Sequence, residues 1–215
     1  LVRSMSELGL AGPELSQWQA LTSEPNGMLI VTGPTGCGKT TTLYSALRTL
    51  ARPELNVCTI EDPIELVDPA LNQMAVQPGI GVDFASGIRT LLRQDPDIIM
   101  VGEIRDGLTA ETALQAAMTG HLVLSTLHTN DAPSSVTRLL DLGIAPFVLR
   151  AALLGIVAQR LVRMLCARCK RPATPDVDEW RVLTSPYQVR VPEQVYQAVG
   201  CDECRHTGYK GRIGI

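Results

Sequence analysis

The feature that most restricts the fold of this chain is a glycine-rich segment, GPTGCGKT, at residues 33–40. It satisfies the pattern G-x-x-x-x-G-K-[ST], and it lies between a continuous apolar run at residues 28–31 and a helical pattern at residues 39–50. The glycines let the backbone wrap an anion with its N–H groups pointing inward, and the following helix directs its positive end at the same anion. A chance glycine turn is the alternative, but the order strand, turn, helix favours a phosphate-binding loop.

The side chains at the end of this loop predict which phosphates it holds. We expect Lys39 to reach the β- and γ-phosphates of ATP and the Thr40 hydroxyl to bind Mg²⁺. Cys37 is expected to be a small filler that does not touch phosphate. The predicted nucleotide-binding residues are Gly33, Pro34, Thr35, Gly36, Cys37, Gly38, Lys39, Thr40 and Thr41.

Short apolar runs alternate with helical patterns along the first three quarters of the chain. Further strands are expected at residues 57–60, 98–101 and 122–125, and helices within 5–24 and at 84–93, 109–119, 133–140 and 146–165. Residues 62–82 contain several Pro and Gly and predict an irregular segment. Alternating strands and helices predict βαβ units, hence an α/β domain with a mostly parallel sheet over residues 1–164. Residues 165–215 form a separate, loop-rich module in this interpretation.

Polar side chains stand where the expected strands end. Glu61 and Asp62 follow one strand, Glu103 follows the next, and His128 follows a third. In an open parallel sheet these ends share one edge, where chemistry collects. ATP hydrolysis needs a carboxylate for the magnesium shell and a group that orients or deprotonates water, and the two glutamates would supply both. A lone acid after a strand is often a helix cap or a surface charge. The convergence of these polar side chains on one sheet edge beside the loop is what favours a catalytic role.

Four of the six cysteines form two C-x-x-C pairs: Cys166, Cys169, Cys201 and Cys204. Four thiolates at tetrahedral corners make a closed, structural Zn²⁺ site, so we expect zinc here rather than a disulfide frame. Four unpaired buried cysteines and a redox dithiol remain as alternatives.

The bulk composition excludes some functions. The net charge is −3, so the whole chain lacks the basic footprint of a nucleic-acid binder. No apolar run reaches the roughly 18 residues that span a bilayer. Because the chain opens with Leu1, we interpret it as a fragment. The lack of a targeting signal in a fragment therefore does not indicate where the protein is located.

The sequence resembles the type II secretion and type IV pilus-assembly ATPases, the family of general secretion pathway protein E. The resemblance runs over most of residues 25–215. The matching stretches lie at residues 26–46, 59–65 (TIEDPIE), 91–106 (LLRQDPDIIMVGEIRD), 119–130 (TGHLVLSTLHTN), 158–169 (AQRLVRMLCARC) and 207–214 (TGYKGRIG).

This resemblance implies a RecA-like fold with an additional strand and assigns roles to residues. Glu61 lies in the family's aspartate box and is expected to activate water. Glu103 occupies an atypical Walker B site and is expected to bind magnesium through water. His128, in the histidine box, would sense the γ-phosphate or a neighbouring subunit.

Four further residues have less defined expectations. Arg89, Arg93 and Arg105 are candidates for charge stabilisation or for structural ion pairs, and His121 is expected to be structural.

The resemblance also implies a motor that works as a homo-hexamer with inner-membrane secretion or pilus platform proteins, in the cytoplasm at the inner-membrane face. Family members carry an N-terminal domain that contributes arginines to the site, and they continue past Ile215, so this fragment is expected to hydrolyse ATP poorly. Many secretion ATPases carry the tetracysteine element. The alternatives are a DNA-uptake or conjugation ATPase and a nucleotide-binding scaffold with little turnover. Direct nucleic-acid binding is not expected.

Overall fold

The computed structural model describes residues 3–187 and 189–215, so Leu1, on which the interpretation as a fragment rests, lies outside it. The chain divides into two compact units, one formed by Leu1–Arg160 with Gly214–Ile215 and the other by Leu161–Ile213. This division comes slightly before residue 164, because residues 161–165 form a strand that pairs inside the second unit.

The first unit is built on a six-stranded sheet in which every pair of neighbouring strands is parallel. The strand order is β3-β2-β4-β5-β1-β6, which inserts β5 between β1 and β4. The strands expected at residues 28–31, 57–60, 98–101 and 122–125 are all present. Their bounds are β1 (Gly27–Thr32), β2 (Val57–Glu61), β3 (Asn72–Ala75), β4 (Ile98–Val101), β5 (Leu122–Leu127) and β6 (Leu153–Ala158).

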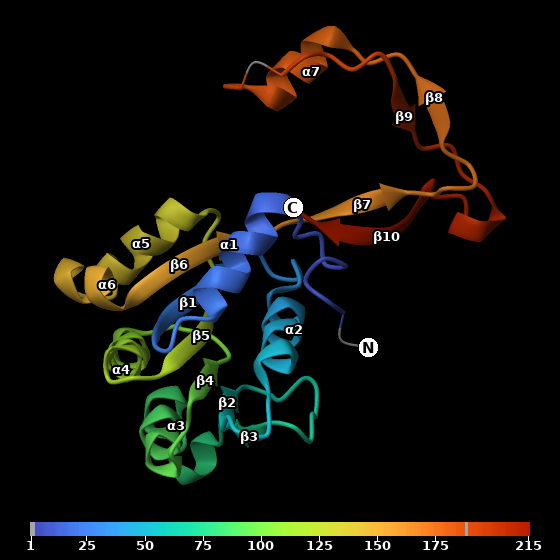
Figure 1. Cartoon of the computed structure of the whole chain (residues 1–215). Helices are drawn as coiled ribbons and strands as arrows, with labels where there is room; N and C mark the ends of the chain where they lie inside the picture. The colour runs from blue at the N-terminus through green and yellow to red at the C-terminus, as the bar shows by residue number, and fades with distance from the viewer. Residues whose placement is uncertain (1–2, 188) are drawn as a thin grey trace. The chain divides into compact units, whose positions relative to one another are not determined.

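Helices cover both faces of this sheet (Figure 1), as the buried apolar character of its strands requires. Side chains alternate along β1, so Met28 and Ile30 pack into one core cluster while Leu29 and Val31 pack into the other. The first cluster includes residues of α3 (Phe84–Leu91), α4 (Gly107–Met118), α5 (Ala132–Asp141) and α6 (Pro146–Ala152). The second includes residues of α1 (Gly12–Thr22) and α2 (Lys39–Leu50).

The helix expected over residues 146–165 is wrong beyond Ala152. The chain leaves α6 at Leu153 and forms β6, which pairs with β1, and then β7 (Leu161–Leu165). The apolar run of β6 contains the β-branched residues Ile156 and Val157, which favour a strand once a parallel partner is available. The irregular segment at 62–82 also contains the short edge strand β3 and a 3₁₀ turn, η1 (Pro78–Ile80).

The second unit consists of two small two-stranded sheets, a helix and several loops. β7 pairs with β10 (Tyr209–Gly214), and β8 (Arg171–Ala173) pairs antiparallel with β9 (Val195–Gln197). The guanidinium of Arg163 lies 3.8 Å from the centre of the Tyr209 ring and joins β7 to β10. The unit also holds α7 (Val177–Thr184) and the turn η3 (Asp202–Cys204).

Candidate functional site

The carboxyl ends of four neighbouring strands carry the residues that the sequence singled out. β1 leads into the glycine-rich loop, β2 ends at Glu61, β4 is followed by Glu103, and β5 is followed by His128. Because these strands are parallel, their ends share one edge of the sheet.

The glycine-rich loop has the backbone that a phosphate site requires. Gly33, Gly36 and Gly38 have φ of 146°, 76° and 90°, which L side chains rarely adopt. Gly38 is the N-cap of α2 and provides no capping side chain, so the first N–H groups of this twelve-residue helix keep their capacity to bind an anion. Lys39 is buried, and its Nζ donates to the carbonyl oxygens of Gly33 and Pro34 at 2.9 and 3.2 Å. The ammonium therefore lies over the loop, and its predicted contact with the β- and γ-phosphates stays a prediction.

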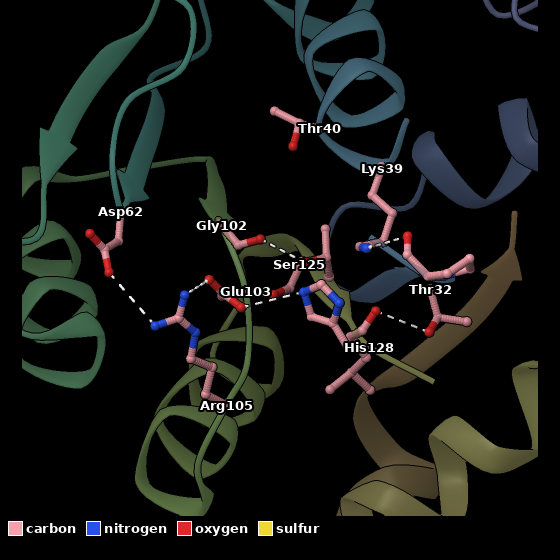
Figure 2. Close-up of polar contacts among 12 residues, drawn as sticks. Thr32, Lys39, Thr40, Asp62, Gly102, Glu103, Arg105, Ser125 and His128 are labelled. Atoms are coloured by element: carbon pink, nitrogen blue, oxygen red, sulfur yellow. Dashed lines mark hydrogen bonds and ion pairs between the residues drawn. The ribbon is translucent and has the colours of Figure 1, made fainter. Parts of the chain in front are cut away.

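Glu103 is held between a cation and a histidine (Figure 2). Its carboxylate forms an ion pair with Arg105, and its other oxygen lies 3.5 Å from His128 Nε2. Arg105 also lies 3.8 Å from the Asp62 carboxylate. The hydrogen bond and the charge of Glu103 raise the pKa of Arg105, so this guanidinium keeps its charge. Among Arg89, Arg93 and Arg105, the three arginines considered for charge stabilisation, Arg105 alone contacts a predicted site residue within the described part of the chain.

Glu61 lies at the expected strand end, but its carboxylate is turned into the protein. It is 3% exposed and accepts hydrogen bonds from the Tyr44 hydroxyl at 2.7 Å and the Thr59 hydroxyl at 2.6 Å. Gln73 Nε2 donates to it at 3.3 Å. Burial, followed by the bond to Glu61, raises the pKa of Tyr44, so the phenol stays protonated as the donor. This hydrogen-bond network joins α2 to β2 and β3.

Glu65 is a candidate that the sequence reasoning missed. Its exposed carboxylate lies 3.5 Å from the Thr40 hydroxyl, the group expected to bind Mg²⁺. The signal was present, since the segment TIEDPIE contains a second glutamate four positions after Glu61. That glutamate lies outside the strand, in the segment expected to be irregular, where periodicity gives no orientation.

Two other residues have structural contacts. Arg93 donates to the Arg89 carbonyl and the Thr90 hydroxyl within its own helical segment. The His121 ring nitrogen Nδ1 lies 2.9 Å from the Ala116 carbonyl at the end of α4, in agreement with a structural role.

The second unit brings its four cysteine sulfurs together. All four lie within 4.8 Å of one another, and Cys166–Cys201, Cys169–Cys204 and Cys201–Cys204 are 3.9, 3.8 and 3.8 Å apart. A tetrahedron with Zn–S bonds of about 2.3 Å has sulfurs about 3.8 Å apart, whereas a disulfide requires about 2.05 Å. The geometry therefore fits one four-coordinate metal ion and excludes disulfides.

The electrostatics of this cluster differ between its thiols. Burial raises the pKa of Cys169 to about 11. Burial opposes ionisation of Cys204 as well, but N–H groups of Cys201 and Gly208 and the neighbouring thiols outweigh it and lower the pKa to about 6. In the metal-free cluster, Cys204 thus ionises more readily than Cys169.

Within residues 3–187 and 189–215, no helix has both the length and the apolar character needed to cross a bilayer.

Several solved structures resemble the chain. The pilus retraction motor PilT, solved with bound ADP, is 39% identical with a TM-score of 0.66, over 78% of this chain and 50% of that one. The ATPase DotB of Legionella pneumophila is 31% identical with a TM-score of 0.65, over 75% of this chain and 47% of that one.

Curated relatives are more similar. The type IV pilus assembly ATPase TfpB of Acinetobacter baylyi is 62% identical over 100% of this chain and 37% of its own length. The type II secretion system ATPase E of Vibrio cholerae is 48% identical over 98% of this chain and 42% of its own. The chain thus spans less than half the length of these relatives. The family described as type II/IV secretion system protein matches residues 1–215, and the chain belongs to that family.

Proposed function

We propose that this chain binds and hydrolyses ATP, and that the full protein uses the energy to drive type II secretion or type IV pilus assembly. The observation that carries the proposal is the complete phosphate loop, with Lys39 folded over it, at the same sheet edge as Glu103 and His128. The names of the relatives, type IV pilus assembly ATPase and type II secretion system ATPase, support the choice of ATP and of the two processes.

The donor set around Thr40 fits a magnesium ion, because hard cations prefer hydroxyl and carboxylate oxygens. Thr40 and Glu65 are 3.5 Å apart, and Glu103 follows a strand that neighbours β2. Bound Mg²⁺ would neutralise charge on the β- and γ-phosphates. Thr40 would be a direct ligand, and Glu103 would act through water.

In this proposal the two glutamates of the segment TIEDPIE, Glu61 and Glu65, have different roles. The family resemblance implied that Glu61 activates water. Its burial and its three hydrogen-bond donors instead favour a role in holding α2 and β2 together, while the exposed carboxylate of Glu65 favours orienting water beside the metal. Lys39 would stabilise charge on the transferred phosphoryl group, and His128 would respond to the γ-phosphate through Glu103.

The cysteine cluster is proposed to hold one structural Zn²⁺, because four thiolates leave no open position for water. The hexameric assembly, the inner-membrane platform partners and the location at the cytoplasmic face of that membrane are proposals that follow from the family.

Phosphate release by the full-length protein tests the function. Lys39→Ala and Glu103→Gln should each abolish most turnover, whereas Glu111→Gln, which changes an exposed glutamate of α4, should not. ATP turnover in the Lys39→Ala protein at the parental rate would contradict the proposal.

A further inference from the structure

Gln159 follows β6 and places a buried side chain amide against the glycine-rich loop. Its Nε2 donates to the Cys37 carbonyl at 2.7 Å, and its Oε1 accepts from the Thr42 hydroxyl at 2.7 Å. A carbonyl can only accept, so the bond to Cys37 fixes which end of the amide is the NH₂ group.

The amide connects three elements that build the loop. Cys37 lies within the loop, Thr42 lies in the first turn of α2, and Gln159 follows the edge strand of the sheet. The backbone N–H of Gln159 also donates to the carbonyl of Thr32 at 2.8 Å, directly before Gly33. A Cβ at Gly33 would collide with the Gln159 carbonyl oxygen, so the loop passes close against this residue.

The bond to Cys37 has a consequence for the anion-binding groups. In a trans peptide the C=O and the following N–H point in opposite directions. A Cys37 carbonyl held by Gln159 therefore points the Gly38 N–H away from Gln159, within the plane of the same peptide. Gly38 is the N-cap of α2, and the N–H groups at this end of the helix would face the phosphates of a bound nucleotide.

We propose that Gln159 is a positioning residue for phosphate binding, which presets the peptide between Cys37 and Gly38 before nucleotide arrives. This inference rests on the proposed nucleotide-binding function. Preset donors bind more tightly because their ordering cost is met during folding. Without the amide, the peptide can rotate, and the loop must be ordered by the ligand.

The test is calorimetric binding of Mg²⁺-ADP to residues 1–215. Gln159→Met keeps the length of the side chain and removes both hydrogen bonds, and it should weaken ADP binding about 10-fold, the loss expected for about one net hydrogen bond. Thr42→Val frees one end of the amide and should weaken binding about 3-fold. Ser45→Ala removes another buried hydroxyl of α2, one with no hydrogen-bond partner among the described residues, and should leave binding unchanged.

A control separates positioning from loss of stability. Leu114→Ala removes a fully buried side chain on the opposite face of the sheet and should lower the free energy of unfolding by about 2–5 kcal/mol without changing ADP affinity of the folded protein. Unfolding is measured for each variant without nucleotide.

The outcomes are distinguishable. ADP affinity of Gln159→Met equal to the parent overturns the inference and leaves nucleotide binding standing. If Gln159→Met does not fold, equal affinities of Thr42→Val and Ser45→Ala overturn it. A parent chain that fails to bind ADP overturns the proposed function, and this inference with it.

Discussion

Removing one cysteine of the cluster should unfold the second unit and leave the first intact. The chosen perturbation is Cys204→Ala, since Cys204 is buried and its sulfur lies 3.8 Å from those of both Cys169 and Cys201. The matched control is Cys58→Ala, which removes a buried thiol from β2 of the first unit.

The magnitude follows from how little the second unit buries. Among the described residues of 161–213, the buried side chains are those of Cys166 and Cys204 alone, whereas the first unit has a core cluster on each sheet face. Apolar burial therefore contributes little to folding this unit. A structural zinc site contributes on the order of 10 kcal/mol, as much as the whole stability of a typical domain. A three-ligand site should lose enough of this energy to leave the unit unfolded.

Hydrogen exchange read by mass spectrometry, together with zinc content, measures both parts. In the parent we expect one zinc per chain and slow exchange in the strands of both units. In Cys204→Ala, zinc should fall towards zero and exchange should become fast throughout 161–213, while β1, β4 and β5 stay protected. Cys58→Ala should retain its zinc. Protected amides in 161–213 of a zinc-free Cys204→Ala protein would refute the reasoning.

Three further results are expected. Lys39→Ala should weaken Mg²⁺-ADP binding between about 10- and 100-fold by calorimetry, because a hydrogen bond to a charged group contributes about 1.5–3 kcal/mol, and unchanged affinity would contradict the assigned contact. Glu65→Gln should lower turnover of the full-length protein about 100-fold or more without changing its nucleotide affinity. Glu61→Gln should lower turnover less than about 10-fold and should also lower the melting temperature. A larger loss of turnover in Glu61→Gln than in Glu65→Gln would identify Glu61 as the base. The zinc affinity should increase as the pH is raised from about 6 towards about 11, because zinc must displace the proton that the raised pKa of Cys169 keeps on that thiol. Competition with a chromophoric chelator at two pH values measures this increase.

Much of the candidate site could be predicted because its signals are local. The glycine loop, its preceding strand and α2 follow one another in the chain, so their order and spacing carry the whole motif. The ends of parallel strands meet at one edge in any such sheet, which is why Glu103 and His128 could be placed together without coordinates. The two C-x-x-C pairs predicted a cluster of four thiols because each pair has the spacing that is typical of zinc ligands.

The predictions that the structure corrected or left untested depend on long-range partners. β6 reads as an apolar segment that fits either helix or strand, and its pairing with β1, far away in sequence, makes it a strand. The sequence shows only that both positions, Glu61 and Glu65, are glutamates. The hydrogen bonds from Tyr44 and Thr59 in the folded chain show that the carboxylate of Glu61 is the enclosed one.

By itself, the sequence determined the α/β class, the phosphate loop and the cysteine cluster, because each is encoded by residues close together or at a regular spacing. The tertiary structure alone decided that Gln159 reaches Cys37, that Glu65 faces Thr40 and that Arg105 holds Glu103. The physical reason is that a side chain's partner depends on where the fold brings distant segments, and no local pattern records that distance.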